Sequence, residues 1–143
     1  MKSASSPHLS ASQNDRQGLS LTRLWYAVGG IMLLAVAIVS LLPAPPAIGV
    51  SDKLSHFLTY VVLSGWFSLL ARQRAVLVGS IIALIAYGML IEWLQGLTGY
   101  RYAEWGDVIA NSAGCLLGTA GYFGPLRRSF IRLDNKLAIL LGR

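Results

Sequence analysis

Residues 24–42, LWYAVGGIMLLAVAIVSLL, run for nineteen positions without a charged side chain. A helix needs about 20 apolar residues to cross about 30 Å of hydrocarbon, because each residue adds 1.5 Å. This stretch therefore predicts a membrane-spanning helix. Pro43 follows it directly. A proline does not continue the backbone hydrogen bonding of a helix, so we expect the helix to end there.

Three further apolar stretches follow, and each contains one polar residue that matters below. They are residues 54–71 with His56, 75–95 with Glu92, and 108–126 with Asn111. Backbone groups in lipid must hydrogen-bond within their own segment, so each stretch predicts a helix. The expected fold is an all-α membrane protein, a bundle of four transmembrane helices over residues 24–126.

Composition supports a chain surrounded by lipid. Hydrophobic residues make up 55% of the sequence and charged residues 13%, with a mean hydropathy of +0.58. A soluble domain usually has about a quarter charged residues. A soluble enzyme and a disordered regulator are therefore poor fits. Cys115 is the single cysteine, which excludes an internal disulfide and a cysteine-based metal site.

The basic residues orient the predicted bundle. The net charge of +6 and the isoelectric point of about 9.9 would otherwise raise nucleic acid as a partner. Ten of the 12 basic residues lie on one predicted side: Lys2, Arg16, Arg23, Arg72, Arg74, Arg127, Arg128, Arg132, Lys136 and Arg143. Lys53 and Arg101 lie on the other. The positive-inside rule then places both termini in the cytoplasm, and no nucleic-acid partner is needed.

The two ends of the chain lie outside the predicted bundle. Residues 1–20 are rich in serine and lack apolar periodicity, which predicts a disordered cytoplasmic tail. Residues 127–143 are basic and favour either a short amphipathic helix on anionic headgroups or a frayed tail. The apolar residues at helical spacing in the helix interpretation are Phe130, Leu133, Leu137, Leu140 and Leu141.

Polar residues collect on the predicted outer side of the membrane. We call the following set the polar layer: Asp52, Lys53, His56, Glu92, Gln95, Arg101, Glu104, Asp107 and Asn111. Spacings of three or four residues give each helix one polar face, and Tyr60 continues the face of Asp52 and His56. Polar groups in membrane segments usually turn toward the bundle interior and pair. The layer apart from Glu104, together with Tyr60, is therefore the candidate ligand-binding site.

Each member of the polar layer also has a structural interpretation. Asp52 and Asp107 suit helix N-termini, where a carboxylate caps free N–H groups. Lys53 suits the headgroup region, and His56 suits a hydrogen bond to a neighbouring helix. Gln95 and Asn111 are typical interhelical hydrogen-bonding residues. Arg101 and Glu104 would form an ordinary solvated pair.

Glu92 fits a structural interpretation least well. It lies in the last turn of its predicted helix, where the helix dipole disfavours an anion. Partial removal from water disfavours its charged form further. We therefore predict that Glu92 pairs with Lys53 or Arg101 across helices, or holds a proton. In the last predicted helix, Gly114-x-x-x-Gly118 indicates close helix packing.

These residues resemble the VanZ-like family of small bacterial integral membrane proteins. The resemblance lies in three blocks that follow one another in order. They are Asp52-Lys53-x-x-His56-Phe57-x-x-Tyr60, then Glu92-x-x-Gln95, then Arg101-x-x-x-x-x-Asp107-x-x-Ala110-Asn111-x-x-Gly114. The resemblance covers roughly residues 24–126. It implies a four-helix protein of the bacterial plasma membrane, from a family named for a protein associated with low-level teicoplanin resistance.

Two functions follow as hypotheses. In the first, the chain is an envelope protein whose polar layer recognises an envelope lipid, a glycan or a partner protein, with teicoplanin susceptibility as the phenotype. In the second, it is an outer-leaflet enzyme acting on a lipid-linked cell-wall precursor, with His56, Glu92 and Asp107 as the catalytic candidates. A transporter is a weaker third hypothesis, because four short spans leave little room for alternating access.

The lipid bilayer is the expected partner of the chain, and a homo- or hetero-oligomer stays open. No cofactor and no metal are expected, since a single histidine makes zinc a poor fit. The net charge of −2 of the layer is compatible with one hard cation, so cation binding stays open.

Overall fold

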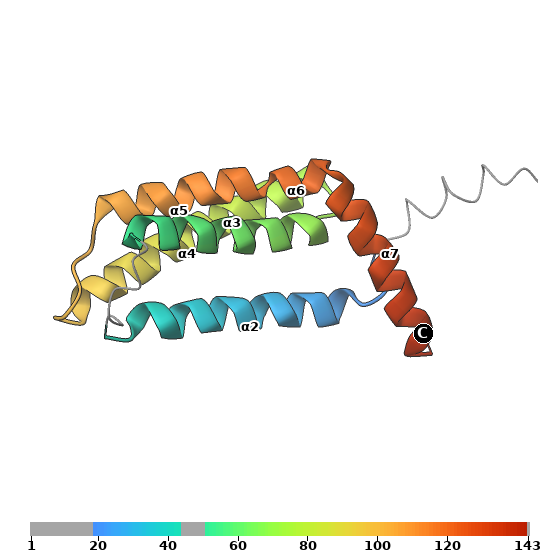
Figure 1. Cartoon of the computed structure of the whole chain (residues 1–143), viewed down its shortest axis with the longest axis horizontal. Coiled ribbons are helices and arrows are strands. Elements are labelled where there is room, and N and C mark those ends of the chain that lie inside the picture. Colours follow the sequence, from blue (N-terminus) through green and yellow to red (C-terminus); the bar gives the residue numbers. More distant parts are fainter. Residues whose placement is uncertain (1–18, 44–50, 143) are drawn as a thin grey trace, which may run out of the picture.

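The computed structural model of the chain describes residues 19–43 and 51–142, and every regular element within them is a helix (Figure 1). The helices are α2 (Thr22–Leu41), α3 (Asp52–Leu70), α4 (Arg74–Leu97), α5 (Trp105–Gly118), α6 (Ala120–Phe123) and α7 (Pro125–Leu140). The all-helical prediction is confirmed for these residues. The predicted disordered tail, residues 1–20, lies outside them except for Leu19 and Ser20.

Two of the helices, α2 and α4, are long and apolar enough to cross a membrane. Their 20 and 24 residues extend about 30 and 36 Å. On α2, apolar side chains face outward, with Ile31 67% and Val39 62% exposed. Large aliphatic side chains are among those most often buried in soluble proteins. This exposed apolar surface therefore suits lipid, as the sequence predicts.

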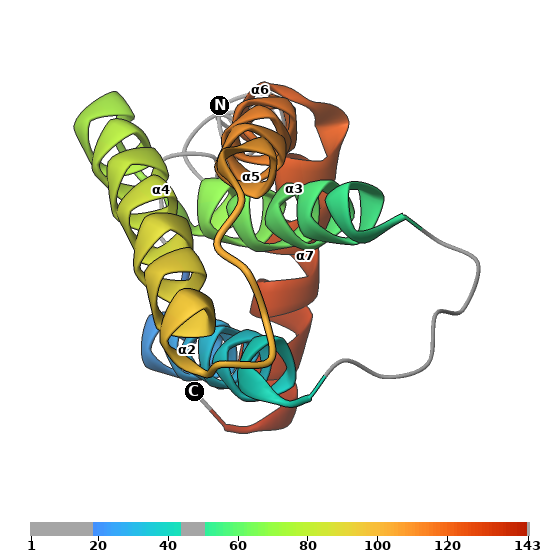
Figure 2. The same cartoon turned by 90° about the vertical axis from the view of Figure 1, so that its left-hand side faces the viewer.

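The helices α2 to α5 run alongside one another and alternate in direction (Figures 1 and 2). The N-termini of α3 and α5 therefore lie at the same end of the bundle as the C-termini of α2 and α4. We call this the polar end, since Asp52 opens α3 and Asp107 lies in the first turn of α5. The opposite end holds the start of α2, with Arg23, and the junction of α3 and α4, with Arg72 and Arg74. The helix α7 lies at this end (Figure 1).

The last predicted span is not one helix. Residues 108–126 were expected to be continuous, but α5 begins earlier, at Trp105, and ends at Gly118. Thr119 follows, and its hydroxyl donates a hydrogen bond to the Leu116 carbonyl at 2.5 Å, a back-bonding contact that bends helices. After α6, Gly124 is extended and Pro125 opens α7, in keeping with the preference of proline for the first turn of a helix.

The helix α7 crosses the end of the bundle at a steep angle to the other helices (Figure 1). A helix is therefore observed at these residues and not a frayed tail, and the prediction that its apolar face lies on headgroups stays a prediction. The side that packs inward consists of Phe130, Asp134 and Ala138, which are four residues apart and buried. Leu133 and Leu140, which belong to the apolar face predicted to lie on headgroups, are 48% and 80% exposed. Phe130 packs with Trp25, their ring centroids 5.0 Å apart, which explains the choice of face.

The closest helix approach in the site region is between α3 and α5, and it depends on glycine. A Cβ atom on Gly114 would lie 2.3 Å from the Phe57 carbonyl oxygen, and one on Gly118 would lie 2.5 Å from that of Val61. The close packing predicted from the Gly114-x-x-x-Gly118 spacing is thus confirmed. It sets the N-terminus of α3 beside that of α5, which brings His56 together with Asp107 and Asn111.

Candidate functional site

The polar layer assembles at the polar end from four parts of the chain. Asp52, Lys53 and His56 come from the start of α3, and Glu92 and Gln95 from the end of α4. Arg101 and Glu104 lie in the connection between α4 and α5, and Asp107 and Asn111 lie on the first turns of α5. The predicted gathering of these residues at one end is therefore observed in the structure.

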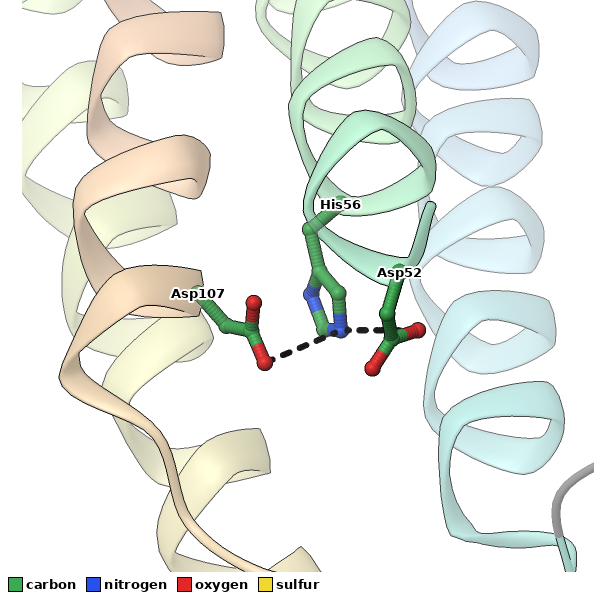
Figure 3. A group of neighbouring side chains, drawn as sticks. All are labelled: Asp52, His56 and Asp107. Atoms are coloured by element: carbon green, nitrogen blue, oxygen red, sulfur yellow. Dashed lines mark ion pairs between the residues drawn. The ribbon is translucent and has the colours of Figure 1, made fainter. Parts of the chain in front are cut away.

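His56 lies between the two aspartates of the layer (Figure 3). Its Nε2 atom is 3.8 Å from Asp52 Oδ1 and 3.9 Å from Asp107 Oδ2. On the other side of the ring, Nδ1 lies 3.3 Å from Asn111 Oδ1. The amide oxygen only accepts, so this hydrogen bond makes Nδ1 the donor and directs Nε2 toward the carboxylates. The predicted face of α3 thus meets the predicted face of α5.

This group is open on one side and closed on the other. The side chain of Asp52 is 63% exposed, whereas those of His56 and Asp107 are 10% and 5% exposed. Asp107 Oδ1 is buried and has no hydrogen-bond partner among the described residues. Buried polar atoms are nearly always hydrogen-bonded, so an unpartnered carboxylate oxygen needs an explanation. The atoms Asp52 Oδ, His56 Nε2 and Asp107 Oδ lie within 4.8 Å of one another.

Helix capping does not explain the two aspartates. Ser51 caps α3, and its hydroxyl accepts a hydrogen bond from the backbone N–H of Leu54 at 3.3 Å. On α5 the N-cap position is Glu104, which makes no side-chain capping bond. Asp107 accepts no hydrogen bond from a helix N–H in the described chain. Both aspartates suit the helix dipole, but neither carboxylate is used as a cap.

Lys53 and Glu104 form an ion pair on the surface of the layer. Lys53 Nζ lies 2.7 Å from Glu104 Oε2, and both side chains are more than half exposed. The lysine stem passes over Gly106, where a Cβ atom would lie 2.6 Å from Lys53 Cε. Glu104 is therefore paired with Lys53 and not with Arg101. The Lys53 ammonium holds the pKa of Glu104 below its ordinary value, through the hydrogen bond and through charge attraction.

The predicted ion pair of Glu92 is wrong. Glu92 is buried, and its Oε1 accepts a hydrogen bond from the backbone N–H of Glu104 at 2.6 Å. Within residues 19–43 and 51–142, neither Lys53 nor Arg101 forms an ion pair with it. The connection to α5 folds back over the end of α4 and supplies this backbone donor. The positions of the spans in the sequence do not reveal such a contact. Glu92 Oε2 has no partner in the described part of the chain.

Gln95 and Arg101 donate hydrogen bonds to the C-terminal end of α2. Gln95 Nε2 donates a hydrogen bond to the Ser40 carbonyl at 2.9 Å, and Arg101 Nη1 donates to the same oxygen at 3.4 Å. Tyr100 Oη donates to the Leu41 carbonyl at 2.5 Å. The last carbonyls of a helix lack partners within it. The interhelical interpretation of Gln95 is therefore confirmed, and Arg101 shares this role.

Tyr60 lies one helical turn after His56 on α3. Its side chain is buried, and its hydroxyl has no partner among the described residues. Gly88 on α4 provides the space: a Cβ atom there would lie 2.9 Å from Tyr60 Oη and 3.1 Å from Asn111 Nδ2. Sequence reasoning did not find the roles of Gly88, Gly106 or the Ser40 carbonyl. A signal existed for Ser40, because Pro43 leaves the preceding carbonyls without helix donors.

Comparison with known proteins identifies the family. The family model described as VanZ/LLP1 matches residues 8–128. A protein of Schizosaccharomyces pombe described as uncharacterized is 29% identical over 90 residues, which is 61% of this chain and 55% of that protein. The chain thus spans about half the length of this curated relative. The relative is eukaryotic, so the resemblance does not fix a bacterial host. No solved structure matches. The matched residues include all three sequence blocks and the polar layer they form, and the chain belongs to the VanZ/LLP1 family.

Proposed function

We propose that the chain is a four-span membrane protein with both termini in the cytoplasm and the polar layer at the outer surface. The apolar helices α2 and α4 support the membrane location. The charge distribution supports the orientation, since Arg23, Arg72, Arg74 and the basic residues of α7 lie at the end opposite the polar layer (Figure 1). In this arrangement α3 and the α5–α6 pair complete the bundle beside the two apolar helices.

We propose that the polar layer binds a polar component of the cell envelope, such as a lipid headgroup or a cell-wall precursor. The observation that carries this is the group formed by Asp52, His56 and Asp107. The side chains of His56 and Asp107 are largely buried and that of Asp52 is exposed. The buried Asp107 Oδ1 lacks a partner among the described residues. A purely structural cluster would satisfy its buried oxygens internally. An opening through Asp52 gives a ligand access to them.

Teicoplanin susceptibility is the phenotype we propose for this site in a bacterial plasma membrane. The antibiotic acts outside the membrane, on the side where the proposed orientation places the polar layer. A bacterium sensitive to teicoplanin expresses the full chain, and susceptibility is measured together with the amount of the protein in the membrane. We expect His56→Gln and Asp107→Asn to remove the effect at unchanged membrane abundance.

Ser55→Ala is the matched control for that experiment. Ser55 neighbours His56 on α3 and is exposed. Its hydroxyl donates to the carbonyl of Ser51, the N-cap of α3, and has no other partner among the described residues. The control should behave as the parent chain. If His56→Gln and Asp107→Asn retain the parent susceptibility while present in equal amounts, the proposed role of the polar layer is wrong.

An outer-leaflet enzyme is the second candidate, and the His56–Asp107 pair favours it. A buried carboxylate beside an imidazole is a common arrangement for proton transfer. Glu92, the third catalytic candidate, bonds to the Glu104 backbone instead. The enzyme hypothesis therefore depends on His56 and Asp107. It predicts that the purified chain releases a product from a lipid-linked precursor, and that His56→Ala abolishes the release.

A further inference from the structure

The carboxylates of Asp52 and Asp107 both lie close to His56 Nε2, at 3.8 and 3.9 Å. We propose that Asp52, His56 and Asp107 bind one divalent transition-metal ion, which presents an open coordination position to the envelope ligand. This inference rests on the proposed function, because it names what the polar layer uses to hold its ligand. It differs from the sequence expectation of no metal. That expectation rested on the single histidine of the layer, and the fold brings two carboxylates beside it.

The distances suit a shared ion better than hydrogen bonds. At 3.8 and 3.9 Å from the two carboxylates, His56 Nε2 is beyond the range of about 2.7–3.2 Å for N–H···O bonds. Around a tetrahedral metal with bonds of about 2.1 Å, neighbouring ligand atoms lie about 3.4 Å apart. The three ligand atoms lie within 4.8 Å of one another, so small side-chain rotations bring them to that spacing.

The hydrogen bond on the far side of the ring supports the same conclusion. Asn111 Oδ1 accepts from His56 Nδ1, so in the neutral ring Nε2 carries a lone pair. This lone pair faces two carboxylates, and a cation placed between them removes the repulsion. Metal-binding histidines typically donate their other ring N–H to an oxygen acceptor, which fixes the ring orientation. Asn111 occupies that position here.

Asp107 gives an independent indication of a ligand. Its side chain is 95% buried and turned toward His56 (Figure 3), yet Oδ1 has no partner among the described residues. It caps no helix, and the lysine of the layer is paired with Glu104. A buried carboxylate without a partner is costly, whereas coordination of an ion stabilises it.

The charge of the polar layer matches a divalent ion. Four acidic and two basic side chains give a formal net charge of −2. An anionic headgroup would be repelled by this layer, but one divalent ion brings its formal charge to zero. One imidazole nitrogen and two carboxylate oxygens suit Mn²⁺ and Zn²⁺. Three protein ligands leave at least one position for water or an anionic oxygen, on the side where Asp52 is exposed.

Metal binding is measured on the full chain, purified in detergent and stripped of metal. We expect one Zn²⁺ per chain by calorimetry, and one Mn²⁺ by loss of the electron paramagnetic resonance signal of the free ion. His56→Gln and Asp107→Asn should each weaken Zn²⁺ binding about tenfold or more. Asp52→Asn should do the same, and because Asp52 is exposed this variant tests the site even if the buried substitutions prevent folding.

Glu104→Gln is the control for attraction by the overall negative charge. It removes one acidic group of the polar layer but none of the three proposed ligands, so the dissociation constant for Zn²⁺ should change much less than in the three ligand variants. The metal site is wrong if the parent chain binds neither ion, or binds both as tightly after His56 and Asp107 are replaced together. Metal binding without any change in teicoplanin susceptibility contradicts the proposed function alone. Loss of the susceptibility effect in variants of a chain that binds no metal contradicts the metal site alone.

Discussion

The Asp134 carboxylate in α7 lies 2.7 Å from the indole Nε1 of Trp25 in α2 and accepts its hydrogen. The same carboxylate accepts from the backbone N–H groups of Ser20 at 2.5 Å and Leu21 at 3.0 Å. Asp134 therefore acts as the cap for the start of α2 from a position more than 100 residues away. It ties α7 to the bundle, and the helix dipole of α2 favours its negative charge.

Asp134→Ala should strongly destabilise the chain. It removes the acceptor for three N–H donors in a site where Asp134 itself is fully buried. One of the three hydrogen bonds is buried and two are partly buried. An unsatisfied buried donor costs about 1–3 kcal/mol, so we expect a loss of about 2 kcal/mol or more. Denaturant unfolding in detergent measures this. Lys136→Ala, on the exposed side of α7, should change the free energy of unfolding by less than about 0.5 kcal/mol. Equal effects of the two substitutions would disprove the capping role.

Gly114→Ala should separate α3 from α5. The added Cβ atom would lie 2.3 Å from the Phe57 carbonyl oxygen, and backbone atoms do not move aside cheaply. Overpacking of this kind typically costs about 1–3 kcal/mol. Because the same contact aligns His56 with Asp107, we also expect weaker Zn²⁺ binding, measured beside unfolding on the same samples.

The matched control is Gly79→Ala on α4. A Cβ atom there meets nothing within 4 Å. Alanine is favoured over glycine in a helix by up to about 1 kcal/mol, so this variant should be as stable as the parent or more so. If Gly114→Ala behaves like Gly79→Ala, the close approach of the two helices is not needed for stability.

The Lys53–Glu104 pair predicts a defined pH dependence. Lys53 lowers the pKa of Glu104 in the folded chain. A lowered folded pKa contributes stability that is present above the unfolded pKa and lost as the pH falls through the folded one. The pair should therefore be intact at neutral pH and open only in acid, below the ordinary range of glutamate.

Carbon-13 NMR of the Glu104 carboxyl group tests this dependence. In Lys53→Met the titration midpoint of Glu104 should rise toward its ordinary value, whereas Lys53→Arg should keep it low. Both side chains are exposed, so the effect on overall stability should be small. An unchanged midpoint in Lys53→Met would show that the pair does not form in solution.

The sequence predicts the helices and the meeting of the polar faces, since both depend on spacing along single helices. His56, Asp107 and Asn111 are brought together as expected because each lies on the polar face of its own helix. The partners of Glu92 and Asp134 were not predictable in this way. Glu92 bonds to a backbone N–H of the α4–α5 connection, and Asp134 to donors at the start of α2. A backbone N–H donor cannot be recognised from the type of side chain at its position. Where it lies depends on how the connections fold over the helix ends.

The last prediction concerns orientation, and cysteine labelling of intact cells tests it. Cys115 is fully buried and is replaced by alanine in the background chain. Tyr102 is 90% exposed at the polar end, and Ser129 is exposed on α7 at the other end. With the basic residues of α7 inside, a membrane-impermeant maleimide should label Tyr102→Cys in intact cells. It should label Ser129→Cys only after the membrane is permeabilised. The reverse pattern would place the polar layer in the cytoplasm and exclude a ligand from the outer surface.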